Sequence, residues 1–334
     1  MGGTRMTTRT GQTVWLAAGL SVVLAAASAV GDVAGQPLPK LPIVAFHRQR
    51  ARAITYARSS ALKALPQAGC SVFKVVARTD LDDQVRRTAE ILGIHGPLES
   101  RWGGLGLMVR EGPPVTSKGA GPRAVGASRL DDSIEFSDHA RQWQGRADGS
   151  PTVLPQQEQA WAIAEQFLAD SGLDTADKRR ECIMYMMEGD HKIGMTVRFR
   201  RAINGLPIRG PGGKAFVDLG DGGQVTGLLY VWRAIQPLGV YPLRTVDEAI
   251  ADLNVRKPAV TAIPPGADRA EFNQAELAYW EDIIGVAQDT VQPVYVLKGR
   301  AFKGSVDIGE VEAIVAAVAS THVTEGAPPS GPPS

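Results

Sequence analysis

The sequence predicts an α+β protein with two helix-on-antiparallel-sheet units that follow an N-terminal signal or anchor segment. Three observations predict it: an apolar leader, an amphipathic helix pattern at 156–171, and alternating strand patterns with tight-turn signals between 182 and 232. The chain has 334 residues, enough for two domains at roughly 100–200 residues each. Its hydrophobic fraction of 44% supplies ample material for a core.

Residues 1–30 are the predicted signal peptide or membrane anchor. Arg5 and Arg9 precede an apolar run over 14–30, and the first acidic residue of the chain is Asp32. A positive segment, an apolar segment and a small-residue exit are the parts of a secretory signal. The run of about 17 residues is also at the lower limit for spanning a bilayer, so cleavage and retention both stay open. We expect an exported protein, extracellular or in the cell envelope, that meets the membrane only through this segment if it is uncleaved.

The remaining chain is expected to divide near residue 150. The expected parts are a linker at 31–45, an N-terminal α+β unit at 46–150, a second α+β unit with a C-terminal extension at 151–320, and a disordered tail at 321–334. The linker and the tail are rich in Pro and Gly, a composition that cannot pack a core.

The second unit has the clearer pattern. Its helix carries apolar residues at the i, i+3, i+4, i+7 and i+8 positions of an amphipathic helix, namely Ala160, Ile163, Ala164, Phe167 and Leu168. Four strands are expected at 182–187, 192–203, 214–219 and 224–232. Asn204-Gly205 is a strong signal for a tight turn between strands, because both residue types tolerate positive φ.

Part of this unit resembles PepSY-type domains. The carrying segments are VRFRRAINGLPI at 197–208 and AFVDLGDGGQV at 215–225, and the resemblance covers about 156–233. Such domains occur in propeptides of thermolysin-like proteases and in exported bacterial regulatory proteins. The resemblance implies a PepSY/cystatin-like helix on a curled antiparallel sheet, and a binding or regulatory role rather than a catalytic one. Residues 277–297 resemble the closing part of larger exported regulators that interact with sensor histidine kinases.

A candidate partner-binding stripe lies on the outer face of the predicted sheet. Alternation puts Arg198 and Arg200 on one face of their strand, and Tyr230 and Trp232 share a face on the strand beyond. If the registers agree, the four side chains form one exposed stripe of the residue types that dominate protein interfaces. The alternative is that the rings pack under the 238–265 segment and the arginines are solvated.

Two cysteines, Cys70 and Cys182, are present. They can form one disulfide in an oxidising compartment, or they can be two buried free thiols. Two distant thiols cannot build a tetrahedral zinc site, and the histidines are scattered, so no metal site is predicted.

Charge and motifs exclude several function classes. The net charge of +1 gives no basic surface for nucleic acid. Nucleophile-elbow and metalloprotease motifs are absent, and no catalytic residue or cofactor is predicted. We therefore expect a non-enzymatic extracytoplasmic protein that binds and modulates a membrane or secreted protein partner. The alternatives are an envelope structural or assembly protein, and an enzyme whose site is assembled from dispersed residues.

Overall fold

The computed structural model describes residues 38–44, 46, 49–65, 69–112, 123–138, 140–142, 150–173 and 175–324. These residues belong to one compact unit, Pro37–Ser334. The predicted signal or anchor segment lies outside the described residues. Within the described part of the chain, none of the helices has the length and apolar character needed to cross a membrane.

The described strands form one mixed sheet of 16 strands. The first eight are β1 (Thr55–Arg58), β2 (Cys70–Val75), β3 (Glu99–Arg101), β4 (Gly106–Arg110), β5 (Ala124–Ser128), β6 (Ser133–Ser137), β7 (Lys178–Glu188) and β8 (His191–Ile203). The others are β9 (Leu206–Arg209), β10 (Lys214–Leu219), β11 (Val225–Val231), β12 (Ile235–Tyr241), β13 (Val260–Ala262), β14 (Arg269–Trp280), β15 (Thr290–Lys303) and β16 (Val306–Ala316). The three α-helices among the described residues are α1 (Leu81–Ile91), α2 (Gln157–Asp170) and α3 (Val246–Asn254).

The predicted fold class, two separate helix-on-antiparallel-sheet units, is wrong. The main path of the sheet runs β12-β2-β15-β14-β9-β8-β10-β11-β6-β5-β4-β3, and β14 pairs in parallel with both β1 and β9. Strand β6 pairs with β11, and β2 pairs with β12 and β15, so strands of the two predicted units alternate within one sheet. Residue patterns indicate which segments are strands, but the pairing of strand edges depends on contacts between distant residues.

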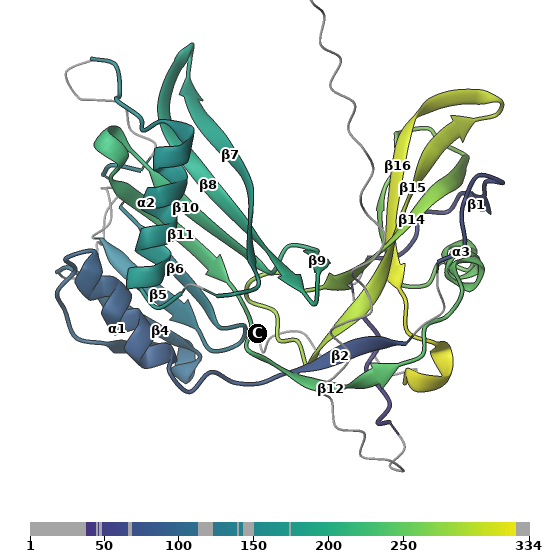
Figure 1. Cartoon of the computed structure of the whole chain (residues 1–334), viewed down its shortest axis with the longest axis horizontal. Helices are drawn as coiled ribbons and strands as arrows, with labels where there is room; N and C mark the ends of the chain where they lie inside the picture. Colours follow the sequence, from purple (N-terminus) through teal and green to yellow (C-terminus); the bar gives the residue numbers. More distant parts are fainter. Residues whose placement is uncertain are drawn as a thin grey trace, which may run out of the picture. The chain divides into compact units, whose positions relative to one another are not determined.

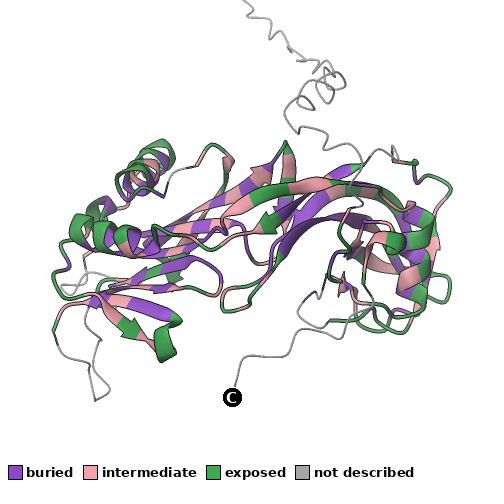
Figure 2. Cartoon of the chain, turned by 90° about the horizontal axis from the view of Figure 1, so that it is seen from below, coloured by how far each residue is buried: buried purple, intermediate pink, exposed green. Residues whose placement is uncertain are grey.

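Helices α1 and α2 lie on the same side of β4, β5, β8, β10 and β11 (Figure 1), and both bury their apolar residues in one hydrophobic cluster. The predicted stripe of α2 is confirmed, because Ala160, Ala164, Phe167 and Leu168 are buried. Exposed residues run along the outer sides of both helices (Figure 2). We call this side of the sheet the helix-covered side.

A second group of buried residues surrounds α3. This helix packs with β1, β14, β15 and β16 on another hydrophobic cluster. The helix begins with a capping box: Thr245 accepts a hydrogen bond from the Glu248 backbone N–H, and the Glu248 side chain accepts from the Thr245 backbone. Near the two ends of the described chain, Leu41 forms a parallel β-bridge with Val323.

A buried ion pair joins the residues that follow β11 and β14. Arg233 and Glu281 are both fully buried, and Arg233 Nη1 lies 3.4 Å from Glu281 Oε1. The guanidinium also donates to three backbone carbonyls, those of Asp282 (2.8 Å), Ile283 (3.1 Å) and Val286 (2.7 Å). The carboxylate and the carbonyls together offset much of the cost of burying this charge.

Arg201 connects this ion pair to β8. Its Nη1 lies 3.5 Å from Glu281 Oε2 and donates to the Arg233 carbonyl at 2.8 Å. Its Nε donates to Asp177 Oδ2 at 2.6 Å, and the second oxygen of Asp177 accepts from Trp232 Nε1 at 3.3 Å. The end of β8 is therefore fixed to the residues that follow β11 and β14.

Phe167→Ala should lower the free energy of unfolding by about 3–5 kcal/mol, because it leaves a cavity under α2. Denaturant melts measure the change, with Gln159→Ala on the exposed side of the same helix as the control. A loss no larger than that of the control would contradict the assignment of Phe167 to the core.

Glu281→Ala should lower the free energy of unfolding by about 3–5 kcal/mol, because it leaves the buried Arg233 guanidinium without its carboxylate. Glu276→Ala is the matched control, since Glu276 lies on β14 shortly before Glu281, in exposed ion pairs, and its loss should cost at most about 1 kcal/mol. Equal losses for the two variants in denaturant melts would refute a structural role for the buried pair.

Candidate functional site: a cationic sheet face

Strand β8 has one buried side and one partly exposed side. Met195, Val197 and Phe199 are buried on the helix-covered side, and the Phe199 ring lies 5.2 Å from that of Trp161 in α2, edge to face. Arg198 and Arg200 alternate with them and point to the opposite face. The alternation predicted from the sequence is confirmed.

Tyr230 and Trp232 do not share a face with the two arginines. Ala215 is the cross-strand neighbour of both Phe199 and Tyr230, so Tyr230 lies on the helix-covered side. The exposed fractions of Tyr230 and Trp232 are 3% and 4%, and their rings stack with centroids 5.6 Å apart. Burial raises the pKa of the Tyr230 hydroxyl well above its usual value. The predicted four-residue stripe is therefore not formed, and a role of the arginines in partner binding stays a prediction.

Strand β10 supplies the neighbours that the arginines do have. Lys214 pairs with Arg200, and Phe216 pairs with Arg198, which places all four side chains on the face opposite the helices. Arg198 Cζ lies 4.3 Å from the centroid of the Phe216 ring, and Lys214 Nζ lies 4.9 Å from it. We call Arg198, Arg200, Lys214 and Phe216 the cationic face.

Positive charge exceeds negative charge on the cationic face. Glu181 lies 3.0 Å from Arg200 Nε and 3.7 Å from Arg198 Nε, and it is the carboxylate of the described residues that pairs with these cations. Lys214 has no carboxylate within ion-pair distance in the same part of the chain. Burial lowers the pKa of its amine, and the charges of Arg200 and Arg198 lower it further. Such an arrangement would gain energy from an added anionic group.

Lys214 and Phe216 are not among the site residues predicted from the sequence. Both belong to a predicted strand whose residues alternate as Lys214, Phe216 and Asp218 on one side and apolar residues on the other. This alternation indicates that one face of the strand is not part of the apolar core. The register that sets Lys214 beside Arg200 depends on the strand pairing, which the sequence does not reveal.

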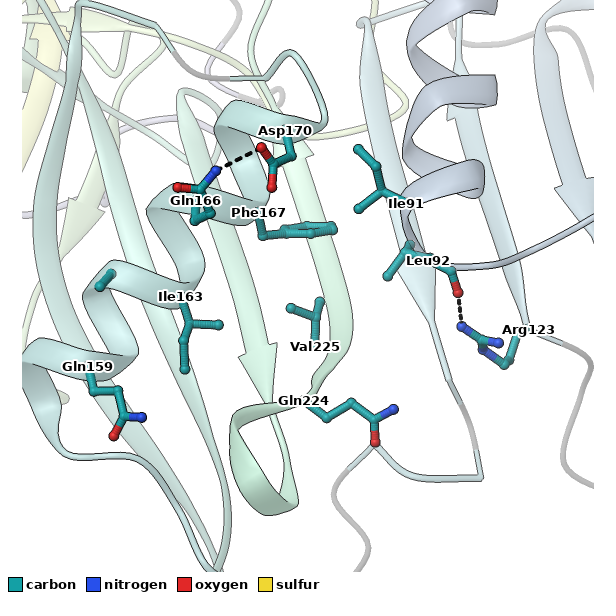
Figure 3. Close-up of a pocket in the computed structure, with 11 residues that line it drawn as sticks. Ile91, Leu92, Arg123, Gln159, Ile163, Gln166, Phe167, Asp170, Gln224 and Val225 are labelled. Carbon is teal, nitrogen blue, oxygen red and sulfur yellow. Dashed lines mark hydrogen bonds between the residues drawn. The ribbon is translucent and has the colours of Figure 1, made fainter.

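A groove lies on the helix-covered side, between the end of α1 and α2 (Figure 3), with a volume of about 650 Å³. Its apolar lining comes from Ile91, Leu92, Ile163, Phe167 and Val225. Its rim carries neutral amides and one ion of each sign, from Gln159, Gln166, Gln224, Asp170 and Arg123. Gln166 donates to Asp170 at 2.7 Å, and Arg123 donates to the Leu92 carbonyl. This lining favours an apolar group over an ion.

Both cysteines are free thiols. Cys70 is buried, with its Sγ 3.4 Å from the Tyr279 hydroxyl oxygen, whereas Cys182 is partly exposed on β7. Within the described ranges, no group of three His, Cys, Asp or Glu side chains is placed to hold a metal ion.

Lys214→Gln should leave the free energy of unfolding unchanged or raise it by up to about 0.5 kcal/mol, because it relieves cross-strand repulsion with Arg200. Lys298→Gln is the matched control: Lys298 Nζ lies 2.9 Å from Glu276 Oε1, so its loss should destabilise by up to about 1 kcal/mol. Denaturant melts at neutral pH compare the two. If Lys214→Gln is the more damaging, Lys214 is not a source of repulsion.

Comparisons with known proteins leave the family open. No protein-family model matches the chain, and no curated protein matches it. Among solved structures, the chain is weakly similar to an uncharacterised protein from Eubacterium rectale ATCC 33656, with a TM-score of 0.42, 9% identity, and coverage of 79% of this chain and 87% of that chain. It is also weakly similar to the Bacillus megaterium YpeB C-terminal domain, with a TM-score of 0.27, 11% identity, and coverage of 68% and 88%. At these TM-scores neither likeness carries an argument, so membership of the PepSY family stays a prediction.

Proposed function

We propose that the chain is an exported binding protein that modulates a protein partner in the cell envelope or outside the cell. In this proposal the cationic face receives an acidic segment of the partner. The single observation that carries it is that three cations, Arg198, Arg200 and Lys214, share one paired carboxylate, Glu181, among the described residues.

The charges of the cationic face favour a negatively charged ligand. Like charges placed opposite each other on neighbouring strands destabilise a sheet, as Lys214 and Arg200 do here. A partner carboxylate beside Lys214 would remove that penalty and raise the pKa of the lysine towards its usual value. Binding of this kind would restore stability that the free protein lacks.

The shape of the face favours a macromolecule. Its residues stand on adjacent strands of an open sheet, whereas small-molecule sites are enclosed and largely apolar. The side chains of Arg198 and Arg200 are both about a quarter exposed, and an arginine that contacts an aromatic ring loses little freedom when it binds a carboxylate. An acidic, extended or flat protein surface fits these features.

Export is supported by the leader alone. Arg5 and Arg9, the apolar run over 14–30 and the small-residue exit are the parts of a secretory signal. The PepSY resemblance of 156–233 agrees with a regulatory role in an exported protein. The nature of the partner is inferred from the cationic face and not from that resemblance.

Site-specific photo-crosslinking in the native host tests the proposal. A photoreactive residue at Leu229, which pairs with Phe216, should give an adduct with a protein partner, whereas the same residue at Gln159 on α2 should not. Lys214→Glu together with Arg198→Glu should abolish the adduct. The N-terminus of the recovered protein reports processing of the leader.

Salt and pH provide the controls. The face is partly exposed, so salt at about 0.5 M should lower the yield of the adduct, because it screens the attraction between the face and the partner. Because the free-state pKa of Lys214 is lowered, the lysine is charged and attracts an anion below that pKa, and the attraction fades as pH rises through it. Adducts of equal yield from Leu229 and Gln159, or an adduct that survives both charge reversals, would refute the proposal.

A further inference from the structure

Strand β7 has a free edge. It pairs with β8 along its whole length, from Lys178 opposite Arg201 to Glu188 opposite His191. No other strand of the described residues pairs with it. The unpaired N–H and C=O groups of such an edge are a template for another strand.

The middle of this edge lacks the usual protection. Irregularities in the register occur between Arg180 and Cys182 and between Met186 and Met187, and the charged residues lie towards the two ends. The segment 182–186 between them contains no charge and no proline. Met184 is 50% exposed, and Met187 just beyond is 48% exposed. A long edge with exposed apolar side chains favours pairing with a further strand.

The ends of β7 carry opposite charges that have no ionic partner within the described residues. The Arg179 guanidinium donates only to backbone carbonyls, those of Ala176 at 2.9 Å and Lys178 at 2.8 Å. Glu188, at the other end, is exposed and forms no ion pair there. An incoming strand with the reverse order of charges would complement both ends.

We propose that β7 pairs antiparallel with β7 of a second copy of this chain, so that one sheet continues through both copies. Antiparallel pairing sets Arg179 opposite Glu188 of the second copy at both ends, whereas parallel pairing would set like charge against like. With the irregularity between Arg180 and Cys182 kept, Met184 of one copy faces Met184 of the second copy, which covers the unprotected middle of the edge. The two-fold axis is perpendicular to the sheet, so the helix-covered sides of both copies lie on the same side.

A charge-swap series on the full chain tests this pairing. The wild-type protein should sediment as a reversible dimer. Arg179→Glu and Glu188→Arg should each weaken dimerisation about tenfold or more, and the double variant should restore it, because the attraction is re-formed with reversed sign. Lys63→Glu is the matched control, since Lys63 is exposed and lies outside β7. Met184→Lys should weaken the dimer without altering either end charge.

Cross-linking gives an independent readout. The proposed register sets the two Cys182 residues about 14 Å apart, from the rise of a strand and the spacing between strands. A thiol cross-linker of that length should join the copies through Cys182, and Cys182→Ser should prevent it, while Cys70 is buried. A protein that stays monomeric up to about 100 μM overturns the inference. So does a dimer that ignores the single charge reversals or that the double reversal fails to restore.

Discussion

The buried contact of Arg233 with Glu281 is the interaction on which the rest of the structure depends. Arg201 extends it to β8, and backbone carbonyls after β14 accept hydrogen bonds from the Arg233 guanidinium. Through these contacts the strands under α1 and α2 share a fixed point with the strands around α3. An apolar contact at this place would allow the strands to shift relative to each other. Charged groups with directional hydrogen bonds hold one register, and that is the best-supported reason for keeping ions inside a protein.

Strand β8 carries structural and surface roles on alternating residues. Phe199 packs against Trp161, Arg201 reaches the buried ion pair, and Arg198 and Arg200 remain on the uncovered face. The arginines are therefore held on a strand that cannot shift without breaking a core contact and an ion pair. Rigid support of this kind places charged groups accurately for a partner.

Local patterns predicted the elements well and their assembly poorly. The buried stripe of α2 and the alternation along β8 both follow from residues close together in the chain. The pairing of β6 with β11 and of β2 with β15 does not, because it is decided between residues far apart. For the same reason Arg200 could be assigned to a face from the sequence, but its neighbour Lys214 could not, and Tyr230 was placed on the wrong side.

The bridge between Leu41 and Val323 has a consequence for how the protein is made. Together with the pairing of β1 with β14, it joins residues near the start of the described chain to residues near its end. Contacts of such long sequence separation form slowly, because a large loop must close before they contribute. These two contacts cannot form on a nascent chain until β14 and the residues around Val323 have been synthesised.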